Sequence, residues 1–148
     1  MSLNELLTEE AVVFLKTNEM KDTIKSLAKK AYELGKIKDL NEFEEAVLDR
    51  EKIVSTGIGL GIAIPHAKLK SIDDFFIIVG KAKKGLDWDA IDRKPVSTVF
   101  LIGGPDGYQK KYLKLLAKLT LLIKNDNRRK ILFESENAKE IITLFEKF

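Results

Sequence analysis

The sequence predicts an α/β (α+β) fold, in which a mixed β-sheet is flanked by helices in a single domain over residues 1–148. Three observations support this prediction. Segments with helical and with extended periodicity alternate along the chain. The length of 148 residues fits one domain, and no repeat, low-complexity tract or linker divides it. The hydrophobic fraction of 45% is sufficient for a sizeable core.

Two amphipathic helices are expected in the first third of the chain. Apolar residues recur at helical spacing over 22–34, and Gly35 follows as a stop signal. A second helix is expected to begin at Asp39, with Glu42 three residues later as its capping-box partner. Near its C-terminal end, the helix dipole favours a cation such as Arg50. The residues of this helix expected to face inward are Leu40, Phe43, Val47 and Leu48.

Three short segments are expected to form strands, namely 60–64, 75–81 and 96–102. Each is rich in β-branched or aromatic residues and is bounded by glycine or proline. The stretch 103–107, Gly-Gly-Pro-Asp-Gly, is typical of a loop.

The last third of the chain is expected to be helical. A long helix is predicted over 109–124, followed by shorter ones over 128–133 and 138–148, the last capped by Asn137 or Ser135. The buried side of the long helix would carry Tyr112, Leu115, Leu116, Leu119, Leu122 and Ile123.

Composition excludes several classes of function. The 26 basic and 23 acidic residues are spread along the chain, which argues against nucleic acid as a partner, and the basic run 128–130 is typical of a solvated helix face. Without cysteine there is no disulfide scaffold and no thiol nucleophile. One histidine cannot supply a catalytic zinc site, so we expect no metal and no cofactor. No signal peptide or membrane span is visible, and we expect a cytoplasmic protein.

The most informative segment is 55–68, Ser-Thr-Gly-Ile-Gly-Leu-Gly-Ile-Ala-Ile-Pro-His-Ala-Lys, which contains the only histidine. The ordinary pKa of histidine, about 6.5, lets a neutral and nucleophilic ring nitrogen persist near pH 7. Pro65 fixes its own φ and favours an extended Ile64, so His66 is expected at a strand end with a constrained backbone. The spaced glycines do not indicate a dinucleotide site, because the Ile-Pro sequence that follows them cannot readily begin a helix.

Four further features accompany this segment and its histidine: Arg50-Glu51-Lys52, Gly85-Leu86-Asp87-Trp88-Asp89-Ala90-Ile91-Asp92, Pro95-Val96, and the late helix around 113–119. Together with the segment 55–66 they resemble enzyme IIA of the fructose, mannitol and nitrogen-regulatory class of the bacterial phosphoenolpyruvate-dependent phosphotransferase system. The resemblance covers roughly residues 3–146. It implies a phosphotransferase with a phosphohistidine intermediate, in which His66 accepts a phosphoryl group from phospho-HPr and passes it on. The recipient is an enzyme IIB in sugar transport, and the membrane is met only through that transporter.

Phosphoryl transfer requires a positioned nucleophile and stabilisation of spread negative charge. His66 would be the nucleophile, and Arg50 would pair with phosphate oxygens, although it can equally serve as a helix C-terminal cation. Hydroxyls and backbone amides would bind the phosphoryl oxygens, the candidates being Ser55, Thr56, Gly57, Gly59 and Gly61. Alternatively, the hydroxyls satisfy turn amides and the glycines permit close packing. Trp88 is expected to pack in the core, with a place on the partner surface as the alternative.

The sequence departs from the family pattern at one position. Many members carry a second histidine at the start of the late helix, where this chain has Tyr112. A tyrosine hydroxyl can donate one hydrogen bond to a phosphoryl oxygen but is not cationic at neutral pH. Three functions follow as hypotheses: a phosphocarrier in sugar transport, a regulatory protein whose phosphorylation state controls its partners, and an interaction domain without useful transfer.

Overall fold

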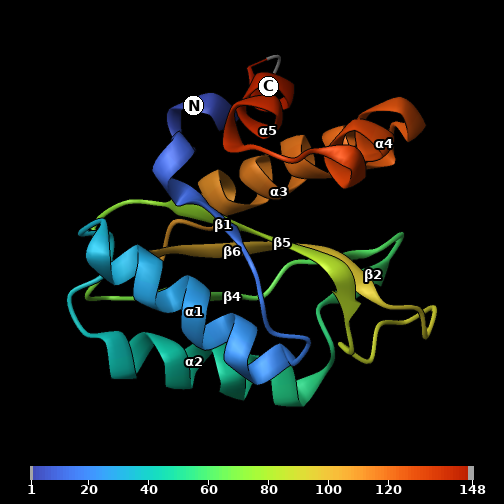
Figure 1. The fold of residues 1–148 in the computed structure, drawn as a ribbon. Coiled ribbons are helices and arrows are strands. Elements are labelled where there is room, and N and C mark those ends of the chain that lie inside the picture. Colours follow the sequence, from blue (N-terminus) through green and yellow to red (C-terminus); the bar gives the residue numbers. More distant parts are fainter. Residues whose placement is uncertain (1, 147–148) are drawn as a thin grey trace.

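The computed structural model describes residues 2–146 as a six-stranded mixed β-sheet with helices on both faces (Figure 1). Helices α1 and α2 cover one face, and α3, α4 and α5 cover the other. The predicted fold class is therefore confirmed. In chain order the elements are η1 (Leu3–Glu5), η2 (Glu9–Ala11), β1 (Val12–Phe14), α1 (Met20–Glu33), α2 (Leu40–Ile53), β2 (Gly57–Gly59), β3 (Ile62–Ala63), β4 (His66–Leu69), β5 (Phe76–Leu86), β6 (Val96–Pro105), α3 (Gln109–Lys124), α4 (Asp126–Glu134) and α5 (Ala138–Phe145).

Strands β5 and β6 form the centre of the sheet. They pair antiparallel to each other, and β1 adds to β5 in parallel. Along its other edge, β6 pairs in parallel first with β3 and then with β4, while β2 pairs antiparallel with β3. The core lies on both faces: Phe43 contacts Phe76 on the α2 side, with ring centroids 5.7 Å apart, and Phe100 contacts Phe145 of α5 at 6.0 Å.

The two helices predicted in the first third are confirmed. Helix α1 ends before Gly35, whose φ of 74° is readily adopted only by glycine. Helix α2 is capped by Asp39, whose side chain accepts a hydrogen bond from the Glu42 amide at 3.0 Å. The reciprocal half of the predicted capping box is absent, because the Glu42 carboxylate accepts instead from Ser71 Oγ at 2.6 Å.

The prediction of one continuous strand over 60–64 is wrong. This stretch is the turn and second strand of a hairpin between β2 and β3, followed by a crossing to β4. Leu60 and Gly61 adopt φ values of 60° and 75°, which reverse the chain in the middle of the apolar run. Apolar composition alone could not distinguish a hairpin of such short strands from one continuous strand.

The loop predicted over 103–107 is also partly wrong, because β6 continues through Gly103 and Gly104 to Pro105. A Cβ atom at Gly103 would overlap the ring of Phe76, and one at Gly104 would overlap the ring of Phe75. Both glycines therefore belong to the sheet as places where aromatic rings lie directly against the backbone.

The C-terminal helices are confirmed, with boundaries close to those predicted. Helix α3 spans the predicted 109–124, α4 begins two residues earlier than predicted, and α5 is capped by Asn137, which accepts from the Glu140 amide at 3.0 Å. The end of the predicted last helix, 147–148, lies outside the described residues. Strand β1 has only three residues, too few for any periodicity to reveal it. Among residues 2–146, no helix has the length and apolar character needed to cross a membrane.

Candidate active site

His66 is the first residue of β4, at the point where the chain joins the edge of β6. Its Nδ1 lies 2.9 Å from the carbonyl oxygen of Ile64. A carbonyl oxygen can only accept a hydrogen bond, so Nδ1 carries the proton and the lone pair of the neutral imidazole is on Nε2. The side chain is half-buried and lines a surface pocket. The geometry therefore presents Nε2 as the nucleophilic atom.

The backbone before His66 is fixed on both sides. The Ile64 amide donates to the Thr56 carbonyl at 3.1 Å, and the Pro65 carbonyl accepts from the Ile102 amide at 3.0 Å. Pro65 has no amide hydrogen and a restricted φ, so it bridges β3 and β4 without leaving a donor unpaired. The predicted strand-end position of His66 is thus confirmed.

The environment of His66 keeps the imidazole neutral. Burial lowers the pKa of His66 below its ordinary value of 6.5, the hydrogen bond to Ile64 partly opposes this change, and the Arg50 charge lowers the pKa further. At neutral pH the ring is consequently in the unprotonated form that can attack phosphorus.

The pocket around His66 has a volume of about 300 Å³ and is formed by α2, the loop after it, β4 and α3. Arg50, in the last turn of α2, lines it and donates from Nη1 to the Val54 carbonyl at 3.1 Å. One guanidinium thus binds the end of α2 and lies near enough to His66 to lower its pKa, and its pairing with phosphate oxygens stays a prediction. The lining residues are Arg50, Ser55, Thr56, Ile58, Ile64, His66, Tyr112, Leu116 and Thr120.

Tyr112 lies across the pocket from β4, on the first turn of α3. Its ring centroid is 5.7 Å from that of His66, and the side chain is 6% exposed. The hydroxyl is buried and has no hydrogen-bond partner among the described residues. Burial raises the pKa of Tyr112 above 10.0, and the Arg50 charge only partly opposes this. The phenol is therefore a neutral donor at physiological pH, and an oxygen-rich ligand in the pocket would supply the partner it lacks.

Lys68, which the sequence did not single out, contributes a second cation. Its Nζ lies 4.8 Å from the centroid of the Tyr112 ring and donates to Gln109 Oε1 at 2.6 Å. The charge of Lys68 also lowers the pKa of His66. Lys68 is two residues after His66 on β4, so both side chains lie on the same face of the sheet.

Glu51 is the second residue that sequence reasoning missed. Its carboxylate is buried and accepts three hydrogen bonds: from the Thr56 amide at 2.8 Å, from Thr56 Oγ1 at 2.7 Å and from Trp88 Nε1 at 2.7 Å. Thr56 in turn holds the Ile64 amide, and Ile64 orients His66. Glu51 follows Phe43 and Val47 at intervals of four, which is the signal that could have placed it on the buried face of α2.

The hydroxyls of Ser55 and Thr56 are used within the protein. Ser55 Oγ donates to the Trp88 carbonyl at 3.2 Å and accepts from the Gly57 amide at 3.1 Å. Thr56 Oγ1 donates to Glu51. Since a hydroxyl has one hydrogen to donate, neither is available to a ligand in this arrangement, although both residues line the pocket. The prediction that Trp88 packs in the core is confirmed by its 2% exposure.

The structure does not bring the three glycines to the pocket. Gly57 packs against Ala90 and Trp88, Gly59 lies beside Asp92, and Gly61 lies beside Ser97 and Phe133. All three are in the β2–β3 hairpin, and a Cβ at Gly57 would overlap Ala90. Their positions correspond to the packing alternative, and the three glycines are not among the residues that line the pocket, so phosphate binding by their amides stays a prediction.

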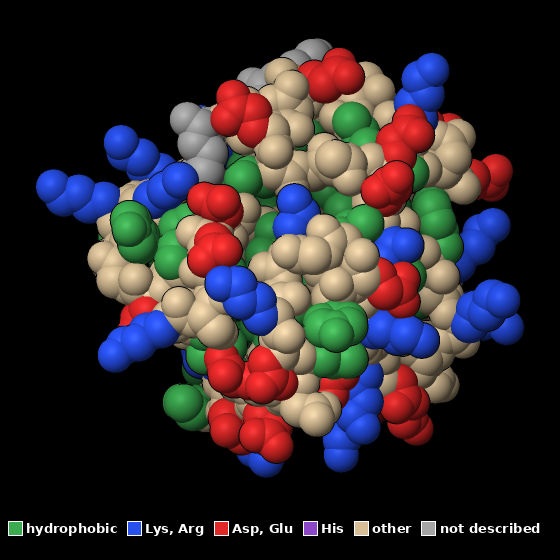
Figure 2. Space-filling view, turned by 90° about the vertical axis from the view of Figure 1, so that its left-hand side faces the viewer, with side chains coloured by type: hydrophobic (Ala, Val, Ile, Leu, Met, Phe, Trp, Pro, Cys, Tyr) green, Lys and Arg blue, Asp and Glu red, His purple; other side chains and the backbone are tan. Residues whose placement is uncertain are grey.

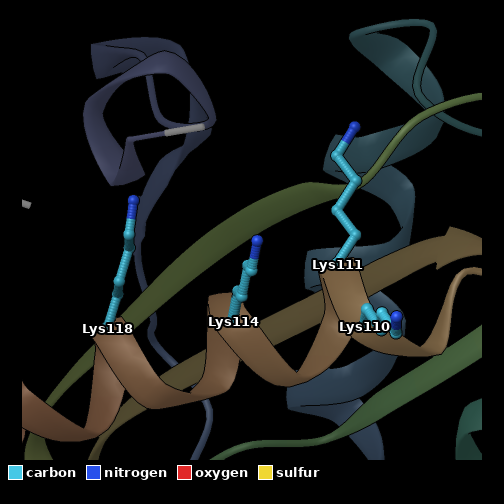
Figure 3. A pocket seen from close by; sticks show the side chains of 4 residues that line it. All are labelled: Lys110, Lys111, Lys114 and Lys118. Atoms are coloured by element: carbon cyan, nitrogen blue, oxygen red, sulfur yellow. The ribbon is translucent and has the colours of Figure 1, made fainter.

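Basic side chains elsewhere do not form a comparable site. Lys110, Lys111, Lys114 and Lys118 line a hollow of about 600 Å³ along α3, and Figure 3 shows three of them, Lys111, Lys114 and Lys118, on one side of that helix. That hollow contains neither His66 nor Tyr112. On the face seen in Figure 2, basic and acidic side chains are interspersed, without a continuous basic patch.

Comparison with known proteins identifies the family. The family described as "Phosphoenolpyruvate-dependent sugar phosphotransferase system, EIIA 2" matches residues 5–148, and the chain belongs to it. A fructose-specific EIIABC component from Bacillus subtilis is 35% identical over 145 residues, which are 97% of this chain and 23% of that protein. A nitrogen regulatory protein from Bradyrhizobium diazoefficiens is 34% identical over 145 residues, which are 97% of this chain and 94% of that protein.

Solved structures share the fold. The nitrogen regulatory protein IIA-Ntr from Neisseria meningitidis superposes with a TM-score of 0.89 at 24% identity, covering 96% of this chain and 97% of that one. The IIA domain for mannitol from Escherichia coli, in complex with phosphorylated IIB, gives a TM-score of 0.83 at 17% identity and covers 96% of this chain and 98% of that one. The expected mixed sheet flanked by helices is thus the fold of the family.

Proposed function

We propose that this protein is a phosphocarrier that accepts a phosphoryl group from phospho-HPr on Nε2 of His66 and passes it to an enzyme IIB in sugar phosphotransfer. One observation carries the proposal. The hydrogen bond from His66 Nδ1 to the Ile64 carbonyl leaves Nε2 unprotonated in a pocket that is also lined by Arg50 and by Tyr112, whose buried hydroxyl has no partner among the described residues. A positioned nucleophile beside a cation is what phosphoryl transfer asks of a protein.

The reaction needs one bond made and one broken. The Nε2 lone pair forms a bond to phosphorus as the bond between phosphorus and the donor breaks, and the donor retains that electron pair. Arg50 pairs with the phosphoryl oxygens, and Tyr112 donates one hydrogen bond to them. Nδ1 keeps its proton, which it donates to the carbonyl of Ile64, so the ring does not need to lose it before attack. Transfer to the recipient is the reverse sequence on a second partner.

The first test is intact-protein mass spectrometry after incubation with phosphoenolpyruvate, enzyme I and HPr. We expect an acid-labile phosphoryl adduct on the wild type and none on His66→Ala, because that variant lacks the nucleophile. The variant should remain folded, since His66 is half-buried at the surface of a pocket and not part of the core. Labelling of His66→Ala would contradict the proposal. No label on the wild type, with a donor active on another acceptor, would favour an interaction domain without transfer.

A regulatory role is the second candidate, and the relatives provide a specific reason to consider it. The Bradyrhizobium nitrogen regulatory protein is 34% identical to this chain, and the similarity extends over 94% of that protein. In that role the charge and acceptor oxygens of the phosphoryl group would make or break an interface with a regulatory partner. Adding an enzyme IIB to the phosphorylated protein discriminates between the two roles. Loss of the adduct to IIB supports sugar transfer, and its retention supports regulation.

Both roles belong to the cytoplasm, which we propose as the location of the protein. In that compartment the membrane would be met indirectly, through the transporter that receives the phosphoryl group from enzyme IIB.

A further inference from the structure

A second polar site lies on the sheet face that carries α3 to α5, away from His66. Lys81 of β5 is 5% exposed and lines a hollow of about 860 Å³ formed by residues of β1, β5, β6 and α4 and the segments next to them. The hollow shares no lining residue with the His66 pocket. Thr98, which pairs with Lys81, is four positions along β6 from Ile102, which pairs with His66, a separation of about 13 Å.

Lys81 is a buried cation without a counter-charge. Its Nζ donates to the carbonyl of Leu132 near the end of α4 and lies 5.9 Å from the centroid of the Phe133 ring. None of the ion pairs formed among residues 2–146 includes Lys81. Burial lowers the pKa of Lys81 from 10.5 to about 8. An ammonium removed from water without an anion costs free energy, and an anionic ligand in the hollow would offset that cost.

The remaining lining residues define what kind of anion fits. The walls carry apolar surface from Phe14, Leu15 and Phe133, and Phe14 and Phe133 are 45% and 41% exposed. Two lysines and two glutamates complete the charged lining, and one such pair, Lys83 and Glu136, is 3.9 Å apart; the four are Lys16, Lys83, Glu134 and Glu136. Their charges offset one another, so Lys81 alone is uncompensated.

We propose that this hollow binds a small apolar carboxylate, whose head group pairs with the Lys81 ammonium and whose hydrocarbon part lies against Phe14 and Phe133. Thr98 lies directly opposite Lys81 in the β5–β6 pair, and its buried hydroxyl has no partner among the described residues. This stretch of the sheet thus holds an ammonium that has a carbonyl partner but no anion, and a hydroxyl without a partner among residues 2–146. A phosphate dianion fits less well, because the lining has one uncompensated cation and apolar walls, and the second charge of the dianion would have no partner there.

The test uses octanoate as the probe and octanol as its neutral counterpart. Isotope-labelled protein is titrated with each compound, and amide chemical shifts are followed for wild type, Lys81→Met and the control Lys83→Met, which changes an exposed lysine of the same hollow. We expect saturable octanoate binding that shifts residues around 81–83 and 133–135. Lys81→Met should bind octanoate about tenfold or more weakly than the wild type does, because it lacks the buried charge-assisted pair, and the wild type should bind octanol more weakly than octanoate by a similar factor. Lys83→Met should bind octanoate within about threefold of the wild type.

The pH dependence provides an independent check. The carboxylate requires a charged Lys81, whose pKa is about 8, so octanoate affinity should fall as pH rises above about 8. The other charged groups that face the hollow are Lys16, Lys83, Glu134 and Glu136. Equal octanoate affinity in wild type and Lys81→Met would overturn the proposal. It would also be overturned by octanol binding as tightly as octanoate, by saturable binding of inorganic phosphate at Lys81 in place of octanoate, or by no saturable binding at all.

Discussion

Replacing Tyr112 with phenylalanine tests two effects of the unpartnered hydroxyl: the free energy it costs in the unphosphorylated protein, and the hydrogen bond it donates to a phosphoryl group on His66. In the unphosphorylated protein the hydroxyl is buried with no partner, a situation that costs about 1–3 kcal/mol. Tyr112→Phe removes that cost and keeps the ring against His66 and Phe75. For a chain of this size about 1 kcal/mol corresponds to about 2–4 °C in Tm. We therefore expect the unphosphorylated variant to melt at least about 2 °C higher than the wild type.

The same substitution should weaken the phosphorylated state. A hydrogen bond from the phenol to a charged phosphoryl oxygen contributes about 1.5–3 kcal/mol, which corresponds to a factor of about 10–100 in an equilibrium constant. The equilibrium between phospho-HPr and this protein should shift toward phospho-HPr by that factor, as measured by intact-protein mass spectrometry of both partners. Tyr108→Phe is the matched control, because Tyr108 is 59% exposed just before α3. A lower Tm with an unchanged phosphoryl equilibrium would refute the reasoning and give Tyr112 a structural role.

Three further predictions concern the titration of His66, the hydrogen bonds of Glu51 and the N-terminal cap of α2. His66, the only histidine, should titrate in an NMR experiment with a midpoint below 6.5, because burial lowers its pKa in the folded protein. The unfolded state then binds more protons than the folded state, so the free energy of unfolding should fall as pH drops below 6.5. A midpoint at or above 6.5 would contradict this. Glu51→Gln weakens the hydrogen bonds that hold Thr56 and, through Thr56, His66. The rate of phosphorylation at saturating phospho-HPr should therefore fall about tenfold, while KM for phospho-HPr is unchanged. A change confined to KM would argue against a role of Glu51 in positioning His66. Asp39→Ala removes the cap of α2 and should lower the free energy of unfolding by about 1 kcal/mol in chemical denaturation, with phosphorylation unaffected; an unchanged unfolding curve would show that the cap contributes nothing.

The parts of the fold that the sequence predicted are those with strong local signals. Helices α1 and α3 carry a clear apolar periodicity, and α2 and α5 have an Asp39 or Asn137 cap whose hydrogen bond can be anticipated from residue type. The errors concern glycines. Whether a glycine reverses the chain, as Gly61 does, or admits a ring against the sheet, as Gly103 does, depends on residues distant in sequence.

In the site, too, the sequence predicts residue chemistry but not the partners that each side chain meets in the fold. The sequence predicts His66 as nucleophile and Arg50 as cation because their residue types carry that chemistry, and both residues line one pocket. The roles of Ser55 and Thr56 could not be resolved from sequence, because a hydroxyl beside a turn can face a ligand or a neighbouring group with equal ease. The structure pairs them with Trp88 and Glu51, through contacts 33 and 5 residues apart in the chain.

The tyrosine at position 112 alters how charge is supplied to a phosphorylated His66. Burial raises the pKa of Tyr112, so the phenol stays neutral at physiological pH, and a phenol cannot supply a cation at that position of α3. Lys68 of β4 supplies a positive charge beside Tyr112, because its ammonium lies 4.8 Å from the centroid of the Tyr112 ring. The same charge lowers the pKa of His66. Arg50 and Lys68 supply guanidinium and ammonium charge, whereas a histidine at position 112 would have an ordinary pKa of about 6.5, within the physiological range. The stability of the phosphohistidine should therefore vary less with pH near neutrality in the wild type than in Tyr112→His, because the substitution adds a neighbouring group that gains or loses a proton there.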